Sequence, residues 1–181
     1  MKLEERPVAR HPYDEALPAL PKMNLTSNDI ADVQRMDAKF TGEGVNVSPH
    51  LKWDPVPGAG SYVVSCFDPD APPPSGFWHW CIVDIPADVT ELPQGAGADD
   101  ATLRAATGGA AFHVRNDNGN LGYNGPMPPA GDRVHRYAFA VHAVKPASLG
   151  VDQAQATNAP VHFMSLFNGL ARGVITGTYQ R

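Results

Sequence analysis

The sequence predicts a mostly all-β protein in which two antiparallel sheets pack face to face, with one or two helices at the edge. Three segments rich in β-branched and aromatic residues predict strands at residues 61–67, 78–85 and 135–144. The 18 prolines are about twice the usual share of roughly 5%, and with 17 glycines they favour short strands and shaped loops.

Weaker patterns precede and separate these strands. Residues 25–27 predict a short first strand. Residues 46–53 alternate apolar and polar side chains and predict an edge strand, because Pro49 has no N–H to donate within a central ladder. Residues 93–131 carry few apolar side chains and predict a long loop, a feature usually functional or disordered. We expect this loop to be largely ordered, since it ends in a proline-rich run.

The C-terminal part departs from the all-β pattern. Apolar residues recur at helical spacing and predict a peripheral helix over residues 160–172, with Asn158 as its cap and Gly173 as its stop. Residues 174–179 then predict a closing strand.

The length of 181 residues predicts one domain, at residues 22–181, with residues 1–21 as a tail draped over it. The tail lacks the apolar stretch of a secretion signal, and no segment reaches the roughly 20 apolar residues that span a bilayer. We therefore expect a cytoplasmic protein. The net charge of −5 argues against nucleic acid or anionic membranes as partners.

The sequence predicts neither a cofactor nor a bound metal, because it has no P-loop, dinucleotide-binding or His-Glu-x-x-His pattern. Cys66 and Cys81 lie in apolar strands and are expected to be buried free thiols. A disulfide stays open if those strands pair.

Two aspartates lie in a stiff segment after the strand at 61–67. Asp68 and Asp70 are two residues apart, so in extended backbone their side chains point to the same side. Prolines between and after them fix the backbone before any ligand arrives. The alternative is that Asp-Pro-Asp forms a simple turn with no role in binding.

Two histidines lie at the ends of apolar strands. If the strand at 78–85 is regular, His79 shares a face with Cys81 and Val83, while the flanking tryptophans share the other. His135 shares a face with the alternating residues that follow it in its strand, Tyr137, Phe139 and Val141. Both histidines are then expected at a pocket rim. The alternative is that His79 is a structural histidine.

Protonated histidines and backbone N–H groups could hold a phosphate or carboxylate, and Gly125 would allow close approach of the backbone. An aspartate could hold a histidine protonated and correctly oriented, or could itself be protonated and donate to the ligand. With His135 at the rim, we expect His135→Ala to abolish binding and to leave the melting temperature nearly unchanged.

Several motifs resemble the phosphatidylethanolamine-binding protein family, which includes the Raf kinase inhibitor protein. They are Asp68-Pro69-Asp70-Ala71-Pro72, Trp78-His79-Trp80, Gly125-Pro126-x-Pro128-Pro129 and His135-Arg136-Tyr137. Residues 46–53 and 85–90 resemble its bacterial branch, and the match covers roughly residues 25–181. The resemblance implies a β-sandwich with a small anion-binding pocket formed by Asp68, Asp70, His79, Gly125, Pro126, His135 and Tyr137.

The residues and the resemblance together leave three functions open. The first is a non-catalytic binding protein for a small anion, such as a phosphomonoester, a lipid headgroup or a carboxylate. The second is inhibition of a kinase or protease through the surface around the pocket. The third is hydrolysis by the Asp/His set, with a metal or by acid–base chemistry. Relatives often pair, which implies a possible homodimer. Met127 and Asp132 depart from common family residues, and Asp132 makes the rim more acidic.

Overall fold

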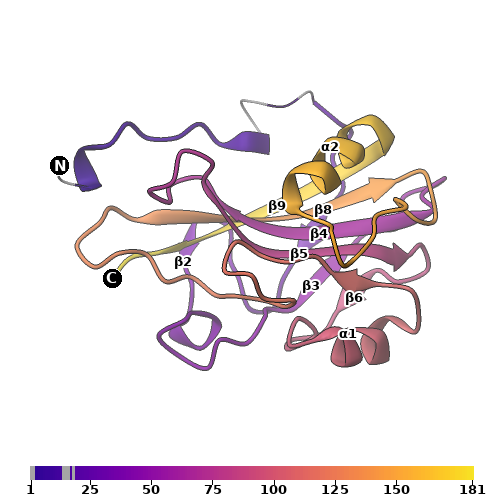
Figure 1. Ribbon diagram of the computed structural model, residues 1–181, viewed down its shortest axis with the longest axis horizontal. Helices are drawn as coiled ribbons and strands as arrows, with labels where there is room; N and C mark the ends of the chain where they lie inside the picture. Colours follow the sequence, from indigo (N-terminus) through magenta and orange to yellow (C-terminus); the bar gives the residue numbers. More distant parts are fainter. Residues whose placement is uncertain (1–2, 14–16, 18) are drawn as a thin grey trace.

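The computed structural model describes residues 3–13, 17 and 19–181, and a six-stranded sheet forms its centre (Figure 1). The strand order is β2-β9-β8-β4-β5-β7. The bounds are β2 Gln34–Arg35, β4 Ser61–Asp68, β5 Phe77–Pro86, β7 Phe112–His113, β8 His135–Val144 and β9 Gly169–Tyr179. Neighbouring strands are antiparallel except β2 and β9, which run parallel and depart from the purely antiparallel expectation.

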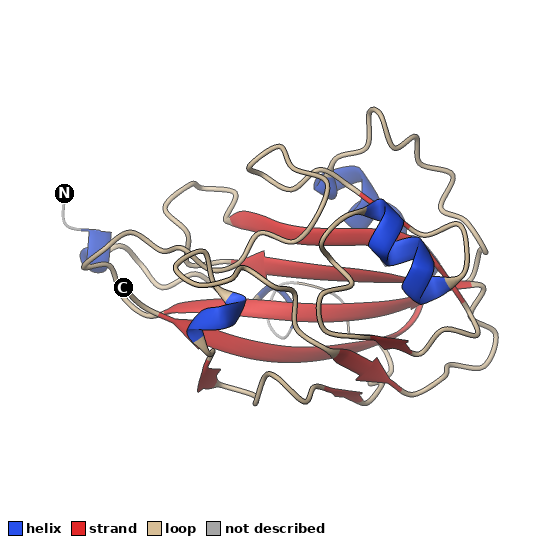
Figure 2. Ribbon diagram, turned by 90° about the horizontal axis from the view of Figure 1, so that it is seen from below, coloured by secondary structure: helices blue, strands red, loops and turns tan. Residues whose placement is uncertain are grey.

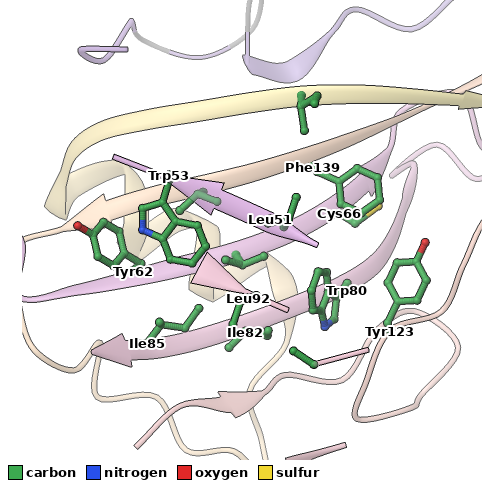
Figure 3. Close-up of a cluster of buried hydrophobic side chains, with 14 of the residues drawn as sticks. Leu51, Trp53, Tyr62, Cys66, Trp80, Ile82, Ile85, Leu92, Tyr123 and Phe139 are labelled. Carbon is green, nitrogen blue, oxygen red and sulfur yellow. The ribbon is translucent and has the colours of Figure 1, made fainter. Parts of the chain in front are cut away.

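A three-stranded antiparallel sheet covers one face of the large sheet, in the order β1-β3-β6. Its strands are β1 Leu25–Thr26, β3 Leu51–Trp53 and β6 Glu91–Leu92. Apolar side chains from the two sheets meet between them (Figure 3) and include Leu51, Trp53 and Leu92 from the small sheet, and Tyr62, Trp80, Ile82 and Phe139 from the large one. Burial of this interface supplies the main hydrophobic contribution to folding.

The opposite face of the large sheet is covered by helix α2 (Asn158–Asn168) and by the N-terminal segment, which lie above the sheet in Figure 1. Val161 of α2 packs on Val63, Cys81 and Val83, while Tyr13 packs near the centre of β8. Helix α1 (Asp100–Thr107) lies on the side of the small sheet, and two short 3-10 helices, η1 (Leu3–Glu5) and η3 (Ala38–Phe40), lie in connecting segments. Figure 2 shows the long strands side by side, with the helices outside the sheet.

The predicted two-sheet sandwich and C-terminal helix are confirmed, but the helix ends earlier than predicted. It stops at Asn168 because β9 begins at Gly169 and pairs with β8. Gly173 lies inside β9, where a Cβ would come within 2.8 Å of the Met23 carbonyl oxygen. Thr157 is the N-cap; Asn158 is already helical, and its side chain donates to the Arg115 carbonyl.

Two other predictions are wrong in their local structure. The segment 93–131 contains helix α1, capped by Asp99, whose carboxylate accepts from the Thr102 N–H, and closed by Gly108 at φ +69°. Only the end of segment 46–53 forms a strand. That strand is the central one of the small sheet, and Pro49 precedes it without interrupting its ladder.

Cys66 and Cys81 are free and buried, as expected. They belong to the hydrophobic clusters on opposite faces of the large sheet, so strand pairing does not bring their sulfurs together for a disulfide. In the described part of the chain, no helix has the length and apolar content needed to cross a membrane.

We expect Leu51→Ala to lower the free energy of unfolding by about 2–5 kcal/mol, because Leu51 is fully buried between the two sheets. Lys52→Ala is the matched control, because Lys52 is the next residue of the same strand and its side chain is exposed. This substitution should change the free energy of unfolding by no more than about 0.5 kcal/mol. Urea unfolding measures both. Equal losses for the two variants would contradict the described core.

Candidate ligand pocket

A cavity of about 550 Å³ opens beside β5 and β8, walled by the proline-rich loops at residues 71–73 and 127–129. Five residues predicted for the site line it, namely Asp68, His79, Gly125, His135 and Tyr137. They come from segments separated by up to about 70 positions, and the fold brings them together. Asp70 and Pro126 do not line this cavity.

A β-bulge turns His79 toward the pocket. Cys66 of β4 pairs with Trp80, but Phe67 pairs with Trp78, so His79 is an extra residue in the ladder. Its ring centroid lies 5.2 Å from that of Tyr137, on the side where Trp80 enters the inter-sheet core. The prediction that His79 shares a face with Cys81 is therefore wrong, because it assumed a regular strand.

The ring of His135 lies between two carboxylates. Its Nδ1 is 2.7 Å from Asp68 Oδ2, and its Nε2 is 3.1 Å from Asp132 Oδ2. Burial lowers the pKa of His135, but hydrogen bonds and charge from Asp68 and Asp132 outweigh this effect, so its pKa is raised. The geometry fits a protonated ring that donates from both nitrogens.

Asp68 matches the first of the two roles considered for the aspartates. One of its oxygens accepts from His135, and the other accepts from the Asp70 N–H at 2.8 Å. A carboxylate in this position fixes the orientation of the imidazole and favours its protonated form.

Asp70 points away from the pocket. Its carboxylate accepts from the Nε and Nη2 of Arg136 at 2.7 and 2.8 Å, and from the Arg136 N–H at 3.0 Å. Since consecutive residues of β8 face opposite sides, Asp68 and Asp70 also lie on opposite sides. The same-side prediction fails because β4 ends at Asp68 and the chain then turns.

Gly125 was expected to let the backbone approach a ligand. In the structure it lets its own loop approach the loop that holds Phe40. A Cβ at this position would lie 2.3 Å from the Phe40 carbonyl oxygen. Its N–H donates to Asn46 Oδ1 at 2.6 Å and is thus already used. The Pro126 carbonyl accepts from the Gly42 N–H, so Pro126 also joins these loops.

Two polar atoms remain for a ligand. His79 Nδ1 lies 2.7 Å from the Asn124 carbonyl oxygen and donates to it, while Nε2 is 4.0 Å from Asp68 Oδ2, beyond hydrogen-bond distance. Burial is the main effect on His79 and lowers its pKa. The Tyr137 hydroxyl is buried with no hydrogen-bond partner among the described residues, and burial together with the nearby Asp68 charge raises its pKa.

Two residues outside the cavity lining, Asp132 and Arg6, extend the hydrogen-bond network of His135. Sequence reasoning placed Asp132 at the rim but missed its contact with His135, and it missed Arg6 entirely. Arg6 Nη2 donates to Asp132 Oδ2 at 2.9 Å and to the Asp70 carbonyl at 2.8 Å. The spacing Asp132-x-x-His135 is a local pattern that could have indicated the contact between Asp132 and His135. No local pattern indicates the contact between Arg6 and Asp132.

The fold and the cavity define a β-sandwich protein with a preformed cavity beside β5 and β8. A family model described as phosphatidylethanolamine-binding protein matches residues 26–180. The chain therefore belongs to the phosphatidylethanolamine-binding protein family.

Individual relatives agree with this assignment. The YbhB protein of Escherichia coli (strain K12) is 44% identical over 163 residues, which cover 87% of this chain and 99% of YbhB. The crystal structure of E. coli YbcL, titled a new member of the mammalian PEBP family, matches with a TM-score of 0.81 and 40% identity, and covers 88% and 99% of the two chains. A putative family homolog from Chlamydia trachomatis matches with a TM-score of 0.73 and 28% identity over 88% and 98%.

We expect His135→Ala to lower the free energy of unfolding by about 3–5 kcal/mol, because it leaves Asp68 and Asp132 buried without their shared cation. The melting temperature should then fall on the order of 10 °C. The sequence-based expectation of an unchanged melting temperature does not fit a ring that is 1% exposed.

The double variant His135→Ala/Asp132→Asn is the control. It removes one of the two facing carboxylates and should recover part of the lost stability. Calorimetry of the three proteins measures the effect, and a His135→Ala protein as stable as the parent would show that the two contacts contribute nothing.

Proposed function

We propose that this chain binds a small anion, a phosphate, phosphoryl headgroup or carboxylate, in the pocket between β5 and β8. The observation that carries the proposal is that two polar groups of the cavity lining make no hydrogen bond in the described residues: the Tyr137 hydroxyl, which is buried, and His79 Nε2, which lies 4.0 Å from Asp68 Oδ2. Both belong to the lining that also holds His135, whose pKa is raised by its carboxylate neighbours. The description of the matching family names a phospholipid ligand and supports the same chemistry.

The donors differ from those expected from the sequence. The Tyr137 hydroxyl can donate at neutral pH, whereas His79 donates from Nε2 only once it is protonated. Because burial lowers the pKa of His79, its ring is harder to protonate than an ordinary histidine, and acid favours the donating form. Both nitrogens of His135 are occupied by carboxylates, so its Nε2 contacts an anion only when Asp132 moves away.

We further propose that the site binds without catalysis. Ser75, the hydroxyl considered as a nucleophile, donates to the Gly76 carbonyl and does not line the cavity, and burial raises the pKa of both cysteine thiols. No group of three or more His, Cys, Asp or Glu side chains within residues 3–13, 17 and 19–181 has the arrangement of a metal site.

Two other expectations stay predictions from sequence. No contact in the structure bears on a kinase or protease partner. Cellular location is likewise open to test, and one relative, 32% identical over 146 residues, is named a putative lipoprotein LppC in Mycobacterium tuberculosis.

Sulfate binding measured by titration calorimetry at pH 5.5 and pH 8 tests the proposal. Sulfate keeps its charge over this range, so a change in affinity reports protonation of the protein. We expect affinity to be about tenfold weaker at pH 8, because acid favours the protonated form of His79, which can donate from Nε2, and alkaline solution removes it. Equal affinity at both values would contradict a role for His79.

Tyr137→Phe should weaken sulfate binding about tenfold at both pH values, the loss of roughly 1.4 kcal/mol expected for one hydrogen bond to a charged group. Tyr179→Phe is the matched control, since its hydroxyl donates to Glu43 and does not line the cavity. Repeating the titration with inorganic phosphate and with glycerophosphoethanolamine distinguishes free phosphate from a lipid headgroup as the source of the anion. No heat of binding with any of these probes would refute the proposal.

A further inference from the structure

We propose that the N-terminal segment regulates this pocket as a latch: Arg6 holds Asp132 against His135 Nε2, and an anion must displace Asp132 to reach that nitrogen. The inference rests on the proposed anion-binding function and adds its regulation. Arg6 lies outside residues 26–180, the part of the chain that matches the family model.

Asp132 occupies the place of a ligand. Its side chain is 0% exposed, and Oδ2 accepts from both Arg6 at 2.9 Å and His135 at 3.1 Å. Oδ1 accepts from the Arg133 N–H at 2.8 Å. A carboxylate on a protonated imidazole makes the same charge-assisted contact that a ligand carboxylate or phosphate oxygen would make. Asp132 and an external anion therefore compete for one donor.

Arg6 is itself held in place by several contacts. Its guanidinium also donates to the Asp70 carbonyl at 2.8 Å, and its side chain is only 17% exposed. Arg133 donates to the carbonyl groups of Glu4 and Arg6, and Arg136 Nη2 donates to the Ala9 carbonyl at 2.7 Å. The segment thus lies in a fixed position across the strand ends that bear Asp68 and His135.

The contacts define two states. In the closed state Asp132 accepts from His135 Nε2, and in the open state it turns away and leaves that N–H of His135, a residue that lines the cavity, without an acceptor in the protein. The apparent affinity for an anion is the intrinsic affinity multiplied by the open fraction. Loss of Arg6 raises that fraction. The same substitution removes a positive charge that attracts anions, which by itself weakens anion affinity. This second effect is only about a few-fold, because the Arg6 charge is partly exposed and screened.

A double-mutant cycle separates these two effects. Sulfate affinity is measured at pH 7 for the parent, Arg6→Gln, Asp132→Asn and the double variant. We expect Asp132→Asn to bind at least about tenfold more tightly, since it removes the competing charge. Arg6→Gln should tighten binding when Asp132 is present and should not tighten it in the Asp132→Asn background. Arg10→Gln, an exposed charge in the same segment, should not tighten binding in either.

A second readout needs no ligand. The latch protects the Nε2–H proton of His135 from exchange with water, so NMR of the free protein should show faster exchange in Arg6→Gln but not in Arg10→Gln. Faster exchange with no sulfate binding in any variant would support the latch and refute the proposed function. Unchanged exchange would refute the latch, as would Arg6→Gln weakening sulfate equally in both backgrounds, because Arg6 would then act only as an attracting charge.

Discussion

The His135 ring bridges the carboxylates of Asp68 and Asp132, and this buried contact ties together segments that meet beside the pocket. Ionised groups are costly to bury unless each has a partner. Here the two carboxylates share one imidazole, and each carboxylate also accepts from a backbone N–H, of Asp70 or Arg133. The contact joins the end of β4, the start of β8 and the loop before β8, so it fixes the three segments that meet at the pocket.

The two pocket histidines have different surroundings, which shift their pKa values in opposite directions. His135 is held protonated by its carboxylates, so its charge is largely neutralised within the protein. His79 has only a backbone carbonyl on Nδ1, and burial lowers its pKa. A pocket with one histidine whose pKa is raised and one whose pKa is lowered is suited to a response to pH, to ligand or to both.

Local sequence pattern was sufficient for the three long strands β4, β5 and β8 and for one face of the site. The alternation from His135 to Val141 correctly predicts that Tyr137 and Phe139 share the pocket side of β8. The face of His79 was not predictable in this way, because the bulge depends on the register between β5 and β4. Asp70 was misplaced since alternation ends where the strand ends. Helix α1 is short and flanked by glycines, so loop and helix signals overlap there.

The contact of Arg6 with Asp132 lies furthest beyond sequence reasoning, because it joins residues 126 positions apart through one side chain. Composition suggested a tail that drapes over the domain; among the described residues of that segment, Arg6, Ala9 and Tyr13 contact the sheet and its loops. No pattern in the sequence indicates which charge of that tail reaches the pocket. Such a contact depends on the complete fold, in which the strand ends and the tail have already been brought together.

The protonation state of the His135 ring in the free protein tests the central claim most directly. Nitrogen-15 NMR of the imidazole at pH 7 distinguishes a ring with two N–H groups from either neutral form. A ring protonated on both nitrogens, and still so above pH 6.5, agrees with an imidazolium shared by Asp68 and Asp132. A neutral ring with one N–H at pH 7 would contradict the account.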